Sequence, residues 1–242
     1  MMLTVFVIYD KYGMLFNRTD KMKIWTPYES MGESAKLCPK ENNIKILLRH
    51  SIRQDMEEKV AQLTREGKKI AELFGKELGA NIGIISSSFV QRCMDTCNEI
   101  IKGYNKTHLE YKPPVLKSRM LQKPHIMNTP ESKDTWDKLG IEGIFDGFAK
   151  NIDMPGIYNL ETSVNRLLDY IFETGNENNT VDIYCAHDFQ LSMLLLYLNE
   201  KKYEYKQLLF SGDDTWPFML EGMFLWKEND HIKIAWRGKI IK

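Results

Sequence analysis

The sequence lacks the features that would place it in a membrane, in an oxidising compartment or on nucleic acid. Its 242 residues contain no stretch of about 18 consecutive apolar residues, the length that a membrane-spanning helix needs. Its four cysteines include no Cys-x-x-Cys pair, which argues against a disulfide framework and a zinc ribbon. Lysine plus arginine and aspartate plus glutamate each count 33, so the chain has no overall basic field for nucleic acid.

The N-terminal segment is not typical of a secretion signal. Residues Met1–Tyr9 are largely apolar, but they lack a basic start, sufficient length and a small-residue cleavage site. Together with the scattered cysteines, this favours a reduced, cytoplasmic protein without a membrane partner. Because opposite charges balance over the whole chain, any site for an anionic ligand must be built from a local group of basic residues.

The first chemically informative motif is R-H-S-I-R at positions 49–53. It directly follows the apolar run 44–48, which is typical of a short buried strand. Open α/β sheets bind ligands at the carboxyl ends of their strands, where this run places Arg49 and His50. Guanidiniums match phosphate oxygens, and an imidazole between Arg49 and Arg53 can attack a bound phosphorus atom. The alternative is a helix-capping histidine between two solvated arginines.

A second histidine also lies between a predicted strand and a predicted helix. Residues Val181–Ala186 are rich in β-forming side chains, and the apolar stretch Phe189–Leu198 is typical of a buried helix. His187 and Asp188 lie between them, which suggests that this pair reaches the same sheet edge as His50. Taken singly, Asp188 is more typical of a helix N-cap and His187 of a hydrogen-bonded histidine at a strand end.

A third segment places another arginine near this edge. Residues Gly83–Ser87 are typical of a strand, and Ser88 with Gln91 forms a capping box that predicts a helix from Ser88. Arg92 would then lie in the first helical turn, with its side chain leaning toward the amino end. That end of a helix attracts anions through its free N–H groups. Alone, such an arginine is usually a surface residue.

These segments together resemble the histidine phosphatase superfamily. Four matches occur in the order of that family: R-H-S-x-R at 49–53, L-T-x-x-G…A at 63–71, S-S…R…T at 87–96, and the His-Asp pair at 187–188. The His-Asp pair, and Pro217 with Glu221 further on, resemble the acid phosphatase branch more than the phosphoglycerate mutase branch. The resemblance runs from about residue 44 to the C-terminus.

The resemblance and the alternation of strands and helices predict an α/β fold, a three-layer sandwich with a mostly parallel central sheet. Residues 44–242 would form the catalytic domain, with two antiparallel strands at 222–226 and 231–236 near its end. Residues 1–43 would be an extension packed on the core, and they could include a hairpin over 4–16.

The connection 103–157 reads as irregular and is rich in lysine, methionine and proline. A connection of this length within a compact domain is usually functional or poorly ordered. We interpret it as a cap-like insertion over the pocket, where leaving-group specificity would be set. Several of its basic residues could contact the substrate, although each one alone is more typical of a solvated loop: Lys112, Lys117, Arg119, Lys123 and His125.

The resemblance implies a phosphohistidine mechanism. His50 attacks phosphorus, and the non-bridging oxygens are held by four residues, Arg49, Arg53, Arg92 and His187. Asp188 protonates the leaving alcohol and then draws a proton from the water that cleaves the phosphoenzyme. No cofactor or metal is expected, because the arginines neutralise the phosphate. A metal site of Cys93 and Cys97 with His50 is less favoured than buried thiols.

Two questions stay open from the sequence. The mutase branch takes its acid from a glutamate in the middle segment, but Glu142 carries only the tail of that motif and Glu110 lacks the expected neighbours, so Asp188 is preferred. The predicted activity is hydrolysis of a phosphomonoester, either a small phosphorylated molecule or a phosphopeptide. The alternatives are a phosphoglycerate-mutase-type phosphotransferase and a non-catalytic phospho-ligand-binding protein. The oligomeric state is not predicted.

Overall fold

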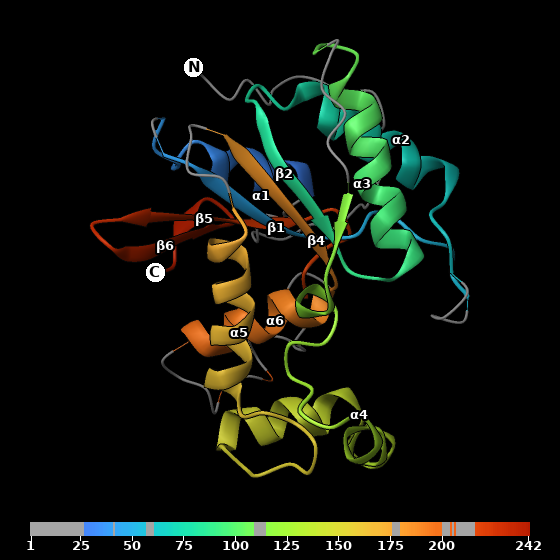
Figure 1. Ribbon diagram of the computed structural model, residues 1–242, viewed down its shortest axis with the longest axis vertical. Coiled ribbons are helices and arrows are strands. Elements are labelled where there is room, and N and C mark those ends of the chain that lie inside the picture. The colour runs from blue at the N-terminus through green and yellow to red at the C-terminus, as the bar shows by residue number, and fades with distance from the viewer. Residues whose placement is uncertain are drawn as a thin grey trace, which may run out of the picture.

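A computed structural model describes residues 27–40, 42–56, 61–108, 115–175, 180–199, 204, 206 and 216–242 of the chain. Within these residues, seven strands form one sheet in the order β3-β2-β4-β1-β5-β6-β7 (Figure 1). The first four in this order are parallel: β3 (Val115–Lys117), β2 (Ile82–Ser87), β4 (Val181–Ala186) and β1 (Ile44–Arg49). The other three are antiparallel: β5 (Gly222–Glu228), β6 (His231–Trp236) and β7 (Lys239–Ile240).

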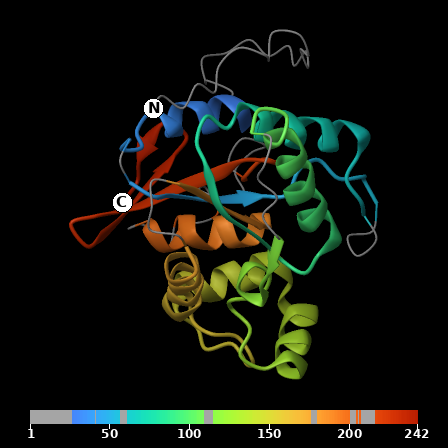
Figure 2. The same cartoon turned by 45° about the horizontal axis from the view of Figure 1, so that its top comes forward.

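Helices cover both faces of this sheet, and each face has its own apolar core. One core joins Ile46 and Leu48 of β1 to three helices, α1 (Pro27–Ala35), α2 (Arg65–Glu77) and α3 (Gln91–Tyr104). The other joins Leu47 to two helices, α5 (Leu160–Glu173) and α6 (Asp188–Leu198). Figure 2 shows these helices on opposite sides of the strands. The predicted three-layer α/β fold is therefore confirmed.

The pattern of burial along the strands explains why the sequence indicated them. All six residues of β4 are buried, as expected for a parallel strand that has helices on both faces. At the end of the chain, β5 and β6 form the predicted antiparallel pair. Their turn has Asn229 and Asp230 at φ angles of 49° and 62°, the left-handed conformation that a tight hairpin turn needs.

The segment 103–157 is not irregular, and this part of the prediction is wrong. After the end of α3 it contributes β3, the short 3₁₀ helix η2 (Arg119–Leu121) and the 22-residue helix α4 (Thr129–Lys150). The helical period is hard to read because α4 bends at Gly140, where φ is +62°, and because its buried apolar residues follow the bend: Ile144, Phe145 and Phe148.

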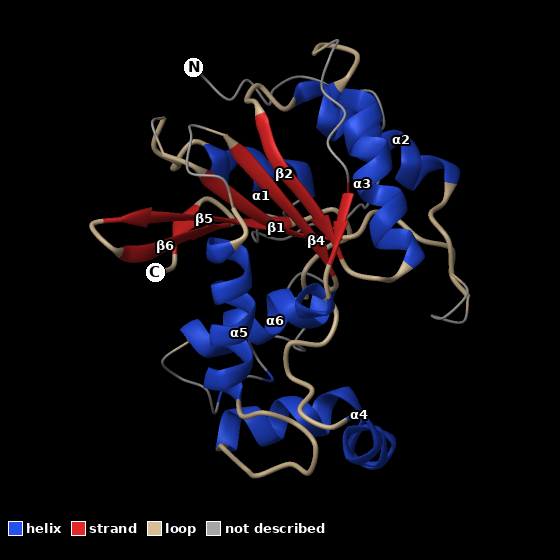
Figure 3. Cartoon of the chain, viewed as in Figure 1, coloured by secondary structure: helices blue, strands red, loops and turns tan. Residues whose placement is uncertain are grey.

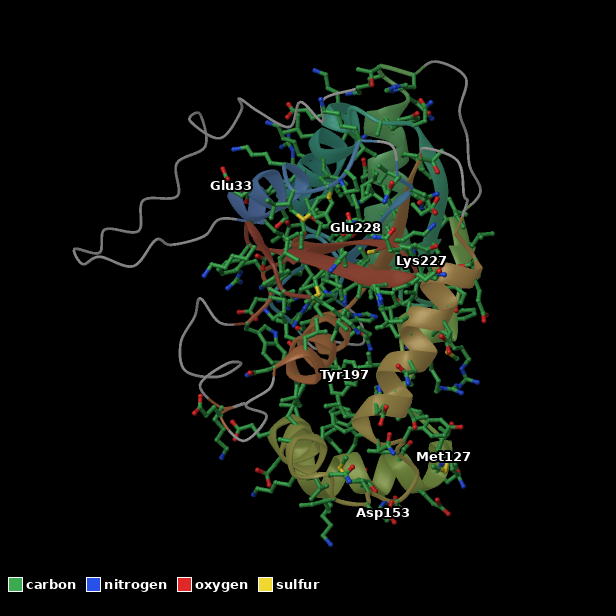
Figure 4. The ribbon with its side chains drawn as sticks, turned by 90° about the vertical axis from the view of Figure 1, so that its left-hand side faces the viewer. Glu33, Met127, Asp153, Tyr197, Lys227 and Glu228 are labelled. Carbon is green, nitrogen blue, oxygen red and sulfur yellow. The ribbon has the colours of Figure 1, made fainter. Side chains whose placement is uncertain are left out.

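Helix α4 lies beyond α5 and α6, at the end of the molecule away from α1 (Figure 3). The same arrangement is visible in Figure 4, where Met127 and Asp153, on either side of α4 in the chain, lie far from Glu33 of α1. A separate layer of this kind is compatible with a cap, but its role over the pocket stays a prediction.

The predicted hairpin over 4–16 lies outside the described residues. The last part of the 1–43 segment forms α1, a helix that the sequence did not indicate. Met31 and Ala35 of this helix are buried against the sheet, and Ser34 Oγ accepts a hydrogen bond from Gly238 N at 3.1 Å. Among the described residues, no helix is long and apolar enough to cross a bilayer.

Candidate active site

The sheet topology brings three chain segments to one edge. Strands β2, β4 and β1 are parallel neighbours, so their carboxyl ends lie side by side. In this register Arg49 pairs with Ala186, and Ser87 pairs with Cys185. The residues that follow these strands are His50, His187 and Ser88, which therefore meet at the edge where open α/β sheets bind their ligands.

His50 is buried and is held in one tautomer. Its Nδ1 lies 2.8 Å from the carbonyl oxygen of Ser51, which can only accept a hydrogen bond. Its Nε2 lies 2.9 Å from Nε of Arg92, which can only donate. The proton therefore belongs on Nδ1, and the lone pair of Nε2 points toward Arg92.

Burial and neighbouring charges keep this imidazole neutral. The pKa of His50 is lowered to about 3, mainly by burial and also by His187, Arg92 and Arg49, against the opposing effect of the Ser51 carbonyl. A neutral imidazole at ordinary pH has the free lone pair that a nucleophile needs.

The loop that carries His50 is fixed by the layer of helices beneath it. Ser51 N donates to Thr96 Oγ1 of α3 at 3.0 Å, and Ser51 Oγ donates to the Gly67 carbonyl of α2 at 2.8 Å. A Cβ on Gly67 would lie only 2.1 Å from the carbonyl oxygen of Ile52, so glycine is needed for this close approach. These contacts hold the imidazole rigidly with respect to α3.

The second histidine lies beside the first. The ring centroids of His50 and His187 are 5.6 Å apart, with the planes at 69°. Nη2 of Arg92 lies 3.3 Å from His187 Nδ1, so one buried guanidinium contacts both imidazoles. The two histidines are therefore close enough to contact a single phosphoryl group.

The start of α3 differs from the prediction. The helix begins at Gln91, and its N-cap residue Val90 makes no side-chain capping bond, so the predicted capping box at Ser88 is wrong. Instead, Ser88 Oγ accepts from Val90 N at 3.3 Å and lies 3.0 Å from His187 Nε2. The hydroxyl is used to hold the second histidine, and Arg92 still lies in the first turn of α3 as predicted.

Arg49, the last residue of β1, forms an ion pair with Asp188, the first residue of α6. Nη2 of Arg49 lies 2.7 Å from Asp188 Oδ2, and Nη1 donates to the Pro217 carbonyl at 2.6 Å. The same Asp188 oxygen accepts from Trp216 Nε1 at 3.1 Å. Burial raises the pKa of Asp188, but Arg49, Trp216 and the two histidines outweigh it, so that the pKa lies below its usual value.

Arg53 lies apart from this group. Its Nη1 donates to two carbonyls of its own loop, those of Gln54 at 3.2 Å and Met56 at 3.3 Å. Its charge is nevertheless close enough to Arg49 to lower the pKa of that residue, although burial of Arg49 is the larger cause. Of the six predicted site residues, the structure thus gathers five and leaves Arg53 at the rim.

The candidate contacts from the segment 103–157 have different positions. His125 is buried, and its ring lies 4.4 Å from that of Phe189, next to Asp188 in the chain. Three of the basic residues are exposed, Lys117, Arg119 and Lys123. Lys112 lies outside the described residues.

Two functional candidates were not singled out by the sequence. The sequence pattern predicts a helix cap for Ser88, and Trp216 carries no signal beyond its place in the segment with Pro217 and Glu221 that resembles the family. The thiol of Cys93, considered above as a metal ligand, lies 3.7 Å from Nε2 of His187. In the described part of the chain, no cluster of three or more histidine, cysteine or acidic residues could hold a metal ion.

Solved structures with this arrangement of elements were found, although no family model and no curated protein matches the sequence. A mycobacterial glucosyl-3-phosphoglycerate phosphatase with inorganic phosphate has a TM-score of 0.52 and 17% identity, covering 82% of this chain and 95% of that one. A mutant phosphoserine phosphatase from Entamoeba histolytica in complex with phosphoserine has a TM-score of 0.52 and 15% identity, covering 83% and 97%. A structure called mycobacterial hydrolase 1 has the same TM-score and identity, covering 82% and 96%.

This chain has the phosphoglycerate-mutase-like fold of the histidine phosphatases. At such low identity the likeness establishes the fold and not the activity. The predicted closeness to the acid phosphatase branch of the histidine phosphatases stays a prediction.

Proposed function

We propose that this protein is a phosphomonoester hydrolase that works through a phosphohistidine on His50. The observation that carries the proposal is the hydrogen-bonded state of this residue. Nδ1 is held by the Ser51 carbonyl, and the lone pair of Nε2 faces a guanidinium that also contacts the second histidine. A phosphoryl group held by that guanidinium would lie directly in front of the nucleophile.

The neighbouring arginine supports an anionic ligand. Within the described part of the chain, Nε of Arg49 is buried and has no acceptor, although its two Nη atoms are bonded. Buried donors are nearly always paired, so an unused N–H at this position indicates that an external acceptor completes the site. A phosphate oxygen is such an acceptor, and guanidinium donors match its geometry.

Binding of the substrate must first release the nucleophile. In the structure, the Nε–H of Arg92 occupies the lone pair of His50 Nε2. A phosphate dianion accepts this N–H more strongly than a neutral imidazole does, because the bond then joins opposite charges. The lone pair of Nε2 becomes free at the moment when the phosphorus atom is in place.

The chemical steps then follow from the positions of His50 and Asp188. Nε2 of His50 forms a bond to phosphorus while the ester P–O bond breaks, and Asp188 gives its proton to the leaving oxygen. The Ser51 carbonyl accepts from Nδ1–H and stabilises the positive charge that develops on the ring. A water molecule then attacks phosphorus, the N–P bond breaks, and the water proton passes to Asp188.

Asp188 must gain a proton before the first step, although Arg49 and its other neighbours keep it ionised in the free protein. A bound phosphate dianion would neutralise Arg49 and place negative charge near the carboxylate, and both effects raise the pKa of Asp188. We therefore expect maximal activity at mildly acidic pH, and a flat profile from about pH 4 to 9 would contradict this role.

The likeness to structures named as phosphatases supports hydrolysis, and complexes with phosphoserine and inorganic phosphate in that group support a small phosphorylated substrate. A phosphopeptide is the larger alternative. Because arginines neutralise the phosphate, we expect EDTA to leave kcat unchanged. Loss of activity that a divalent ion restores would contradict the metal-independent scheme.

The decisive experiment is to trap the phosphoenzyme. The wild-type protein is mixed with ³²P-labelled phenyl phosphate and quenched at alkaline pH, because phosphohistidine is labile to acid. We expect label in the peptide that contains His50 and none in His50→Ala, whose hydrolysis of p-nitrophenyl phosphate falls by about 10³-fold or more. Label on another residue, or full activity of His50→Ala, would refute the proposal.

The same assays separate the alternatives and test the acid. Incubation with 3-phosphoglycerate yields inorganic phosphate if the protein is a hydrolase and 2-phosphoglycerate if it is a mutase. Asp188→Asn should lose roughly 10²- to 10³-fold in kcat with phenyl phosphate and much less with p-nitrophenyl phosphate, whose leaving group needs no proton. Equal losses with both substrates would assign Asp188 another role.

A further inference from the structure

We propose that Trp216 is a positioning residue for the acid–base step, holding the Asp188 carboxylate through its indole N–H. This inference rests on the proposed function and adds a residue to it. The indole Nε1 donates to Asp188 Oδ2 at 3.1 Å, on the same oxygen that accepts from Arg49 Nη2 at 2.7 Å. The other carboxylate oxygen accepts from Phe189 N at 2.9 Å.

The two donors on Oδ2 respond differently to substrate. Arg49 carries a charge and is attracted to a bound phosphate, so its bond to Asp188 weakens when substrate arrives. The indole is uncharged, and it can donate but not accept. Trp216 therefore keeps its bond to the carboxylate in both states and fixes the orientation of Asp188 after Arg49 turns to the substrate.

The loop that carries Trp216 is built to hold this position. Arg237 binds Glu221 through Nε at 2.9 Å and Nη2 at 3.0 Å, and the Glu221 side chain is fully buried. Nη2 of Arg237 also donates to the Trp216 carbonyl oxygen at 3.3 Å. The backbone N–H of Phe218 donates to Oε2 of Glu221 at 2.8 Å. This ion pair, in which Glu221 is buried and Arg237 is partly exposed, thus anchors the backbone on either side of Pro217.

The indole ring and the segment after it have partners on the site side. The Pro217 carbonyl accepts from Arg49, and the ring of Trp216 lies 6.1 Å from that of Phe145 in α4, at 78°. Trp216 is therefore fixed from three directions, by the ion pair, by Arg49 and by an aromatic contact. A donor held in this way loses little entropy when it binds the carboxylate.

The bond has a chemical consequence. A neutral N–H that donates to a carboxylate favours the ionised form, as do the charged groups around Asp188: Arg49 from β1, His50 from the following loop, and His187 at the start of α6. Removing the indole N–H should raise the pKa of Asp188, because a hydrogen bond that favours the carboxylate is lost.

The test is the pH dependence of kcat with phenyl phosphate in Trp216→Phe, which keeps an aromatic ring against Phe145. We expect the limb that reports protonated Asp188 to move up by about one pH unit. With p-nitrophenyl phosphate, which needs no acid, the shift should be much smaller. A profile that coincides with that of wild type would overturn the inference.

A matched control is Trp136→Phe. Trp136 belongs to the same aromatic group, with ring centroids 5.3 Å from Phe189 and 5.8 Å from His125, and this substitution removes an indole without altering the donors to Asp188. We expect its profile to match wild type. An equal shift in both variants would mean that loss of packing, and not loss of the N–H donor, is responsible.

A second measurement does not require the Trp216 variant to fold. In wild-type protein with ¹⁵N-labelled tryptophan, the Trp216 Nε1–H resonance should titrate with Asp188, and it should not titrate in Asp188→Asn. A resonance that is constant with pH in wild type would overturn the inference. If Asp188→Asn hydrolyses phenyl phosphate at the wild-type rate, the proposed general acid fails instead, so the two failures are distinguishable.

Discussion

Strands β1 and β4 have one ion pair near their amino ends and another near their carboxyl ends, and the two pairs differ in their exposure to water. At the amino ends of β1 and β4, Lys45 Nζ lies 2.6 Å from Asp182 Oδ2, with 5% and 0% of the side chains exposed. At the carboxyl ends, Arg49 and Asp188 are 2.7 Å apart, with 11% and 29% exposed. One pair is closed to water and the other opens to it.

The partners of the two pairs differ as well. Lys45 also donates to Asn43 Oδ1 at 2.9 Å, and the second Asp182 oxygen accepts from Ile84 N at 2.8 Å. At the carboxyl edge, Arg49 has a buried N–H with no acceptor in the described part of the chain, and Arg92 lies nearby in contact with both His50 and His187. Although the formal net charge of the chain is zero, positive charge is thus concentrated at one edge of the sheet, where a bound anion can balance it.

The strongest test of this comparison exchanges one basic residue at each end of β1 for methionine. Arg49→Met should lower kcat/KM for phenyl phosphate about 10³-fold while the free energy of unfolding falls by about 1 kcal/mol. Lys45→Met should cost about 3–5 kcal/mol in unfolding free energy, because it leaves Asp182 buried without its counter-ion. Urea denaturation and initial rates measure the two effects.

We expect kcat of the folded Lys45→Met protein, assayed well below its melting temperature, to equal that of wild type. The exposed pair of Lys133 and Asp137, at 2.6 Å, offers a surface control, since Lys133→Met should change stability by less than about 1 kcal/mol. The comparison between the two edges fails if Lys45→Met lowers kcat as much as Arg49→Met does.

At the carboxyl edge itself, Arg92 and Arg53 should contribute unequally to catalysis. Arg92→Ala should lower kcat/KM at least ~10²-fold, because Arg92 contacts both histidines. Arg53→Ala should lower it only about tenfold, because its guanidinium is bonded to carbonyls of its own loop in the free protein. Steady-state kinetics with p-nitrophenyl phosphate measure both. Equal losses would show that Arg53 moves fully into the site when phosphate binds.

A smaller effect is expected in the stability at acidic pH. Burial lowers the pKa of His125 to about 3, with a small contribution from Lys123, while its unfolded value is near 6.5. The unfolded chain binds more protons between these values, so stability is lost as pH falls below about 6.5. At pH 5 the loss from this residue is about 2 kcal/mol.

His125→Phe should remove this part of the acid sensitivity, because phenylalanine does not titrate and packs against the same Phe189 ring. The measurement is the difference in unfolding free energy between pH 7.5 and pH 5, compared with wild type. His50, whose pKa is lowered in the same direction, continues to titrate and leaves a residual acid dependence in the variant. An unchanged pH dependence would mean that His125 is accessible to protons in the folded protein.

The smallest expected effect is stabilisation by inorganic phosphate. At about ten times its Kd, a ligand that binds only the folded protein stabilises it by about 1.4 kcal/mol, which raises Tm by roughly 3–5 °C in a chain of this size. We expect this rise in wild type and Lys133→Met and its loss in Arg92→Ala. An equal rise in Arg92→Ala would place the phosphate elsewhere.

Parts of the fold could be predicted because their signals are local. The apolar runs that became β1 and β4 are short, buried and followed at once by histidines, and a parallel sheet brings their carboxyl ends together whatever the intervening sequence is. The sequence of segment 103–157 does not indicate α4, because this helix bends at Gly140 and buries its apolar residues mainly after the bend. Its periodicity is therefore not that of one amphipathic helix.

The sequence by itself determined the layered α/β fold and the meeting of two histidines with Arg49 and Arg92, since these follow from strand order and strand ends. Only the tertiary structure decided how each side chain is used. Ser88 has the pattern of a helix cap, yet its hydroxyl holds His187, and Trp216 contacts Asp188 across 28 residues of chain. Such pairings depend on distances between segments remote in sequence, which local pattern and propensity do not encode.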